Sequence, residues 1–141
     1  LNEINIALEA TKNIPTVWLS LIINDRDHLL SGHQLSEIYA LKIERLTCLM
    51  LNCNTVRLTS EALDSFIDNK ILDWGIYPNL GLTQPEIDGE MGEIIDDETF
   101  RNSMFKYLEK TPYIIGACCG STPNHIRIIK DLIIKKINLL D

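Results

Sequence analysis

Short apolar runs alternate with amphipathic stretches along this chain, and the alternation repeats four times. The apolar runs are rich in β-branched residues and predict strands over residues 16–23, 47–53, 74–79 and 113–118. Apolar residues at helical spacing follow each run, and they predict helices that begin near residues 35, 59, 96 and 122. Four consecutive strand–helix units indicate an α/β fold, in which a parallel sheet is covered by helices.

The same pattern predicts which side chains form the core. Trp18 and Trp74 each lie inside an apolar run, so we expect both in the core, with a position facing a pocket left open for either. The last predicted helix is expected to pack through Ile126, Ile129 and Ile133, which share one helical face.

Two observations favour a piece of a TIM-type barrel over an open sheet. The chemically distinctive residues Cys53, Asn79, Cys118 and Cys119 all fall at the carboxyl ends of predicted strands, where barrel enzymes place their chemistry. In addition, 141 residues with four units are about half of the ~250 residues and eight units of a complete barrel. The absence of an initiator Met and of an N-cap before the first helix fits a chain that starts within a domain.

Composition narrows the class of protein. The formal net charge is −7, with 45% hydrophobic and 23% charged residues, which excludes a disordered chain. No basic stretch is available to neutralise phosphates, so nucleic acid is not an expected partner. We expect no membrane span and no signal peptide, because no apolar run approaches ~18–20 residues. Four cysteines without secretory features favour a reducing, cytoplasmic compartment.

Three of the cysteines form a candidate metal site. If Cys53, Cys118 and Cys119 meet at one sheet edge, their thiolates can hold Zn²⁺ and leave its fourth position open. The glycines that flank the adjacent pair permit the sharp turn this requires. Two simpler interpretations remain open from spacing alone: buried apolar thiols, or a disulfide between the adjacent cysteines. Cys48 lies among apolar neighbours and is expected in the core.

Three ordered motifs resemble the homocysteine S-methyltransferase family. Residues 114–127, which read IIGACCGSTPNHIR, resemble its C-terminal signature, approximately GGCCG[ST]TPxHI. Residues 51–53 resemble its G-x-N-C strand end, and residues 77–81 resemble its PNxG element. Met50 and Ala117 replace family glycines, and neither change removes a candidate ligand.

The resemblance implies a fold and a ligand set. Residues 1–141 would form the C-terminal portion of one (β/α)₈ barrel, strands five to eight, with the first four units absent. The family's zinc ligands correspond to Cys53, Cys118 and Cys119. Asn79 corresponds to an Asn that lies beside the metal and ligates it when substrate is absent.

The resemblance also implies a reaction. Zinc would bind the sulfur of homocysteine as a thiolate, which attacks a methyl donor and yields methionine. Family donors are S-methylmethionine, S-adenosylmethionine, betaine or a folate–cobalamin system, and the segment does not distinguish among them. The missing half-barrel would supply acidic groups for the substrate, so this segment alone is expected to be inactive and to need that half or to self-associate. The alternative is a non-catalytic zinc-binding half-barrel.

Other polar residues are given weaker roles. His125 would lie in the first turn of the last helix, with a structural or surface role rather than a ligand role. His28 and His33 are given no site role. The acidic cluster of Asp88, Glu90 and Glu93 is interpreted as a solvated loop, and Ser20 is left open as a residue that lines the pocket.

Overall fold

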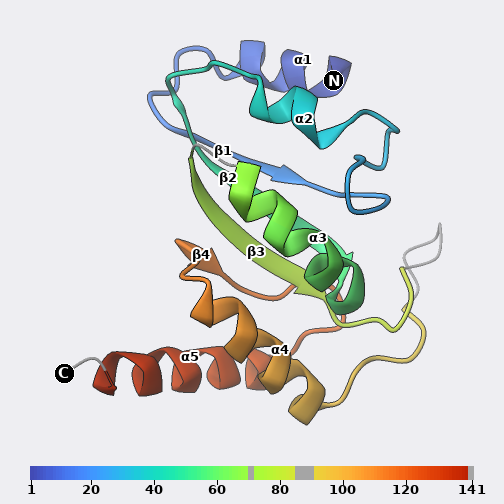
Figure 1. The fold of residues 1–141 in the computed structure, drawn as a ribbon, viewed down its shortest axis with the longest axis vertical. Helices are drawn as coiled ribbons and strands as arrows, with labels where there is room; N and C mark the ends of the chain where they lie inside the picture. Colours follow the sequence, from blue (N-terminus) through green and yellow to red (C-terminus); the bar gives the residue numbers. More distant parts are fainter. Residues whose placement is uncertain (70–71, 85–90, 140–141) are drawn as a thin grey trace.

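The computed structural model describes residues 1–69, 72–84 and 91–139. Helices and strands alternate along the chain (Figure 1) in the order α1 (Asn2–Ala10), β1 (Val17–Leu21), α2 (Leu35–Tyr39), β2 (Leu46–Thr55), α3 (Val56–Asn69), β3 (Asp73–Asn79), α4 (Asp97–Glu109), β4 (Ile114–Ile115) and α5 (Pro123–Asn138). Among the described residues, no helix combines the length and apolar character needed to span a bilayer.

The four strands form one parallel sheet in the order β1-β2-β3-β4, which confirms the predicted α/β class and strand order. The fourth strand is shorter than the predicted 113–118, because only Ile114–Ile115 forms a regular ladder. Hydrogen bonds from backbone N–H groups of Gly116 and Cys118 to carbonyls of β3 nevertheless continue the pairing beyond it. The third helix begins at Val56 rather than near Thr59, because β2 passes into α3 without an intervening loop.

Side-chain caps fix the starts of the last two helices where the sequence predicts them. The Asp96 carboxylate accepts a hydrogen bond from the backbone N–H of Thr99 at 2.7 Å. The Thr122 hydroxyl accepts one from the backbone N–H of Asn124 at 3.3 Å, and proline occupies the first turn. Both caps satisfy N–H groups that have no partner within the helix.

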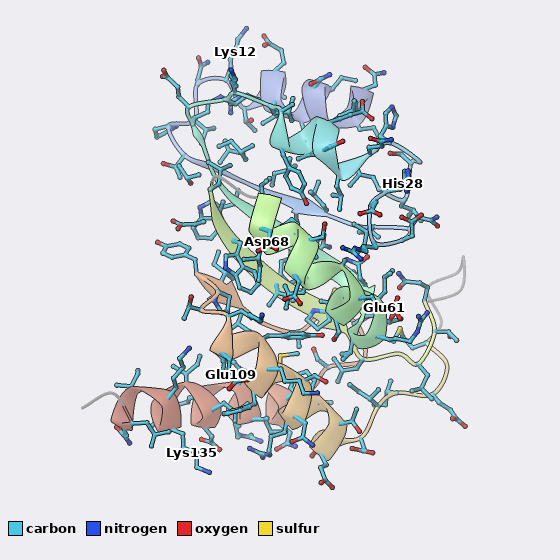
Figure 2. The ribbon with its side chains drawn as sticks, in the orientation of Figure 1. Lys12, His28, Glu61, Asp68, Glu109 and Lys135 are labelled. Atoms are coloured by element: carbon cyan, nitrogen blue, oxygen red, sulfur yellow. The ribbon has the colours of Figure 1, made fainter. Side chains whose placement is uncertain are left out.

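The helices α2 to α5 pack on one face of the sheet, and that interface is the core. Leu49, Leu51, Trp74 and Ile76 face the helices, together with apolar residues of all four helices. Exposed charged side chains, such as the labelled residues Glu61 and Asp68 on α3, Glu109 on α4 and Lys135 on α5, lie on the helices (Figure 2). The molecule therefore has two layers, with the helices on one side only.

The opposite face of the sheet is not covered by helices, although Cys48 and Met50 in its middle are buried. The core prediction for Trp18 is wrong, because 52% of this side chain is exposed on the uncovered face. Its ring meets that of Tyr113 edge to face, with centroids 6.3 Å apart, although the two residues belong to the two edges of the sheet. The Tyr77 hydroxyl likewise reaches from β3 to the Ser20 hydroxyl on β1. Both contacts span the face, so the sheet is curved as a barrel wall is.

Candidate metal centre

The thiols of Cys53, Cys118 and Cys119 converge at the carboxyl edge of the sheet, as predicted. Their sulfur atoms all lie within 4.8 Å of one another. The Cys53 sulfur is 3.5 Å from that of Cys119, and the two adjacent cysteines have sulfurs 3.8 Å apart. Cys53 and Cys118 are half-buried and Cys119 is exposed, so the cluster is open to small molecules.

The end of β3 and a tight turn place the adjacent pair. The backbone N–H of Cys118 donates to the carbonyl of Pro78 at 2.8 Å, and the N–H of Leu80 donates to the carbonyl of Cys119 at 3.0 Å. Gly120 has a φ of +77°, a conformation that favours glycine, and reverses the chain just after the pair. This turn allows two neighbouring thiols to serve one site.

A bulge in β2 places Cys53. Pairing with β3 changes from Asn52–Tyr77 to Thr55–Asn79, so β2 contains one residue more than its partner over this stretch. Within the bulge, Cys53 has a φ of +54°, which is unusual for a residue with a side chain. The predicted strand end at Cys53 is therefore wrong by two residues, because the strand resumes after the bulge.

Buried asparagines hold the backbone around the bulge. The Asn54 side-chain oxygen accepts a hydrogen bond from the backbone N–H of Ile23 at 2.9 Å, which ties β2 to the end of β1. The side-chain nitrogen of Asn79 donates to the Cys53 carbonyl at 2.7 Å and to the Gln84 side-chain oxygen at 2.8 Å. Asn79 is fully buried, and its contact with this cysteine is through the backbone carbonyl.

The donor set fits zinc. Ligands placed tetrahedrally at ~2.3 Å from Zn²⁺ lie ~3.8 Å apart, close to the observed sulfur separations of 3.5 and 3.8 Å. Burial, and to a smaller extent the neighbouring thiols, raise the pKa of Cys53 to about 12. A group of thiolates at this position therefore needs a compensating cation. The four cysteines form no disulfide, so the adjacent pair is not oxidised in this structure.

The other candidate residues lie outside the cluster. His125 is only 4% exposed. Of the two roles predicted for it, the surface role is therefore wrong and the structural role remains. Its Nδ1 accepts from the backbone N–H of Thr122 at 2.9 Å, and its Nε2 lies 3.2 Å from the Asp97 carboxylate. Of the acidic cluster, Glu93 is exposed, and Asp88 and Glu90 lie outside the described residues.

Sequence reasoning missed two residues near the centre. Gln84 bonds to Asn79 from the following loop, and no local pattern indicates that its side chain folds back. Tyr77 lies on the uncovered face and bonds to Ser20. Tyr77 lies two residues before Asn79, so the two side chains share one face of β3. This alternation can be read from the sequence.

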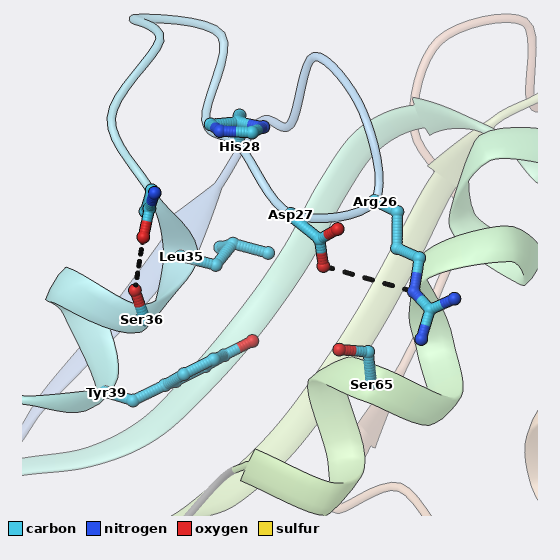
Figure 3. A pocket seen from close by; sticks show the side chains of 8 residues that line it. Arg26, Asp27, His28, Leu35, Ser36, Tyr39 and Ser65 are labelled. Carbon is cyan, nitrogen blue, oxygen red and sulfur yellow. Dashed lines mark hydrogen bonds and ion pairs between the residues drawn. The ribbon is translucent and has the colours of Figure 1, made fainter.

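A separate cavity of about 390 Å³ lies between the loop after β1, α2 and α3, and none of the three thiols lines it (Figure 3). The Tyr39 hydroxyl is buried there without a hydrogen-bond partner among the described residues, and burial raises the pKa of Tyr39 to about 12. Arg26 and Asp27 lie 4.0 Å apart and offset each other's charge. The cavity holds no convergent ligand set, so the thiol cluster is the stronger candidate site.

Comparisons with known proteins identify the family of this chain. The family model for homocysteine S-methyltransferase matches residues 1–133. Homocysteine S-methyltransferase 3 of Zea mays is 32% identical over 131 residues, which cover 86% of this chain and 37% of that protein. Selenocysteine methyltransferase of Astragalus bisulcatus is 26% identical over 124 residues, covering 85% of this chain and 37% of that protein. The chain thus spans less than two fifths of these curated relatives.

Solved structures show the same fold. The apo form of the homocysteine methyltransferase MmuM from Escherichia coli superposes with a TM-score of 0.73 at 23% identity. The match covers 92% of this chain and 45% of the MmuM chain. The metallated form of MmuM gives the same TM-score, with 24% identity over 92% of this chain and 40% of that one. The fold is therefore part of a TIM-type barrel, and by the match over residues 1–133 the chain belongs to the homocysteine S-methyltransferase family.

Proposed function

We propose that the encoded protein transfers a methyl group to the sulfur of homocysteine, forming methionine, and that Cys53, Cys118 and Cys119 hold the Zn²⁺ this reaction uses. The observation that carries the proposal is the convergence of the three thiols within 4.8 Å at the carboxyl edge of a parallel sheet. Barrel enzymes place their chemistry at that edge. Membership of the family supplies the substrate class.

Zinc, when bound, would supply a Lewis acid that lets the homocysteine sulfur react as a thiolate at neutral pH. The chain itself contributes three sulfur ligands, which leaves one position of a tetrahedral ion for the substrate. Because Cys119 is exposed, the substrate can reach the cluster from solvent. Asn79 stays in the proposal as a residue beside the metal centre, since its side chain bonds to the Cys53 carbonyl.

The chain corresponds, in this proposal, to the C-terminal portion of one barrel over residues 1–141. Two features support it: the chain spans under half of the MmuM structure, and one sheet face is uncovered. The first four strand–helix units would cover that face and provide acidic groups for the substrate's amino group. Without them, we expect the segment to be inactive and to associate with itself or with the missing half.

The test of the function is methyl transfer by the encoded protein before and after removal of its metal. Homocysteine is supplied with S-methylmethionine, S-adenosylmethionine or betaine in separate reactions, and methionine is measured. A selenol acceptor is included, because one relative is named as a selenocysteine methyltransferase. The proposal requires methionine formation that is lost with a chelator and restored by Zn²⁺. Activity that persists without metal would contradict it.

A second candidate is a non-catalytic half-barrel that binds zinc, and the uncovered sheet face favours it. The two candidates differ in the coding sequence upstream of Leu1. Four further strand–helix units with pocket carboxylates, in frame, support the enzyme. A stop codon or an unrelated domain at that place supports the non-catalytic protein.

We also propose a reducing, cytoplasmic location. The three thiols proposed to hold Zn²⁺ support it, since free thiols persist where the cell keeps them reduced. Localisation of the tagged protein in its source cells tests this, and an oxidising compartment would contradict it.

A further inference from the structure

Cys53 needs support to keep the backbone conformation that directs its thiol into the cluster. Its φ of +54° lies in the left-handed region, which residues with a Cβ disfavour. The bulge that contains it interrupts the ladder between β2 and β3, so regular strand pairing does not hold this residue. Another contact must therefore stabilise the conformation.

The side chain of Asn79 makes that contact. Its nitrogen donates to the Cys53 carbonyl at 2.7 Å and to the Gln84 side-chain oxygen at 2.8 Å, while its oxygen accepts from the backbone N–H of Gly81 at 3.0 Å. Both N–H groups and the oxygen thus have partners. The side chain is fully buried, so water cannot replace these bonds.

The segment 78–80 holds the backbone of every cysteine in the cluster. Its main chain accepts from the N–H of Cys118 and donates to the carbonyl of Cys119, at 2.8 and 3.0 Å. The amide of Asn79 is the matching contact to Cys53, which the ladder between β2 and β3 does not hold. Since β3 lies inside the sheet, this segment is a fixed template for one thiol from β2 and two from the turn after β4.

We propose that Asn79 is a positioning residue, which orients the Cys53 thiol toward the other two by holding the Cys53 carbonyl, before any metal or substrate binds. The part of this proposal that concerns zinc rests on the proposed function, and the part that concerns the Cys53 backbone does not. The role requires an N–H donor at residue 79. A role as a metal ligand requires only an oxygen.

Asn79→Asp separates these roles, because aspartate keeps the size and the oxygen of asparagine but cannot donate to the Cys53 carbonyl. We expect it to weaken zinc binding by about 10- to 100-fold, measured on the encoded protein by competition with a chelator. Gln84→Glu is the matched control, since it adds the same charge nearby and still accepts from Asn79. We expect that control to remain within about threefold of the unmodified protein. Unchanged or tighter zinc binding by Asn79→Asp, or an equal loss in both variants, would overturn the proposal.

A second variant, Asn79→Ser, tests the proposal if the buried carboxylate of Asn79→Asp prevents folding. Asn79→Ser is uncharged, and its hydroxyl is too short to reach the Cys53 carbonyl. In crystal structures of the metal-free proteins, we expect Cys53 to keep its positive φ in the unmodified protein and to lose it in Asn79→Ser. A retained positive φ in that variant would overturn the proposal. If the unmodified protein bound no zinc, the proposed function would fail, and this structural comparison would still decide the role of Asn79.

Discussion

The sulfur of Cys53 lies 3.5 Å from the sulfur of Cys119, although 66 residues separate them in the chain. The ends of β2 and β4 lie on either side of β3, and a bulge in β2 and a glycine turn after β4 produce this contact. Sulfurs at this separation form no disulfide, which needs ~2.05 Å. Cys119 is exposed, so the cluster is not packed deep in a core. The separation matches two ligands of one tetrahedral ion.

Replacement of one ligand should remove the metal, whereas replacement of the buried cysteine should not. Cys118→Ser exchanges a soft thiolate for a weakly acidic hydroxyl, so zinc content and methyl transfer should both fall by more than about tenfold. Cys48 is fully buried, and Cys48→Ser should lower stability by about 1–3 kcal/mol while zinc per folded molecule stays the same. Metal analysis after removal of misfolded protein compares the two. Full zinc in Cys118→Ser together with loss in Cys48→Ser would refute the ligand assignment.

His125 should matter for stability and not for the metal. It is buried, bonds to Thr122 and Asp97, and packs against Phe100 with ring centroids 4.9 Å apart. We expect His125→Ala to lower the free energy of unfolding by about 2–4 kcal/mol in urea titrations, since it removes hydrogen bonds and leaves a cavity. Zinc per folded molecule should be unchanged.

His33→Ala is the control for that experiment, because His33 is exposed and should cost less than about 0.5 kcal/mol. A folded His125→Ala variant that had lost its zinc would show instead that the imidazole belongs to the metal site.

Alkaline pH should destabilise the fold through Tyr107. Burial raises its pKa to about 12 from the ordinary value of 10.0, while its hydrogen bond with Ser60 acts in the opposite direction. The folded state thus binds more protons than the unfolded state between these pH values. The contribution is fully present below pH 10 and is lost as pH rises through 12, by roughly 3 kcal/mol.

Tyr107→Phe isolates this effect in unfolding titrations at several pH values. The variant loses the hydrogen bond to the Val56 carbonyl, so it should be less stable at neutral pH by about 1 kcal/mol. Its stability should then fall less steeply above pH 10. Parallel pH profiles for the two proteins would exclude Tyr107 as the source.

The uncovered sheet face should make the 141-residue chain associate when it is produced by itself. Trp18 and Tyr113 are 52% and 65% exposed there, and an apolar sheet face with two unpaired edges favours association. Trp18→Lys should weaken self-association in sedimentation experiments. Phe105→Lys, at a 51% exposed position on the helix side, should leave it unchanged. A monomeric chain that transfers methyl groups unaided would contradict this prediction.

The sequence predicts the strands and the thiol cluster well because both follow from local patterns. Four apolar runs lead to four strands, and parallel strands bring their carboxyl ends to one edge. The prediction that the cysteines meet at this edge used only the strand ends and the glycines beside the adjacent pair. Caps at Asp96 and Thr122 were also predictable, since each is a short-range hydrogen bond.

Features set by distant contacts were not predictable. Of the predicted face of the last helix, Ile129 is buried and Ile133 packs against the core, but Ile126 is 50% exposed. Ile128 and Leu132 are buried in addition. The sequence of this helix is rich in isoleucine and has more than one apolar face. The helix packs with His125 buried, and this decides which apolar face meets the core. The bulge at Cys53 depends on Asn79, 26 residues away, and no local pattern predicts it.

Zinc content of the encoded protein, purified without oxygen and in its complete form, tests the central claim most directly. Three converging thiols with sulfur separations of 3.5 and 3.8 Å predict one zinc ion per chain, bound at ~2.3 Å from each sulfur. Metal analysis of the folded protein gives the stoichiometry, and X-ray absorption at the zinc edge gives the ligands and distances. One zinc with three sulfur ligands is the predicted result. Folded protein with reduced thiols and no bound metal would contradict the account.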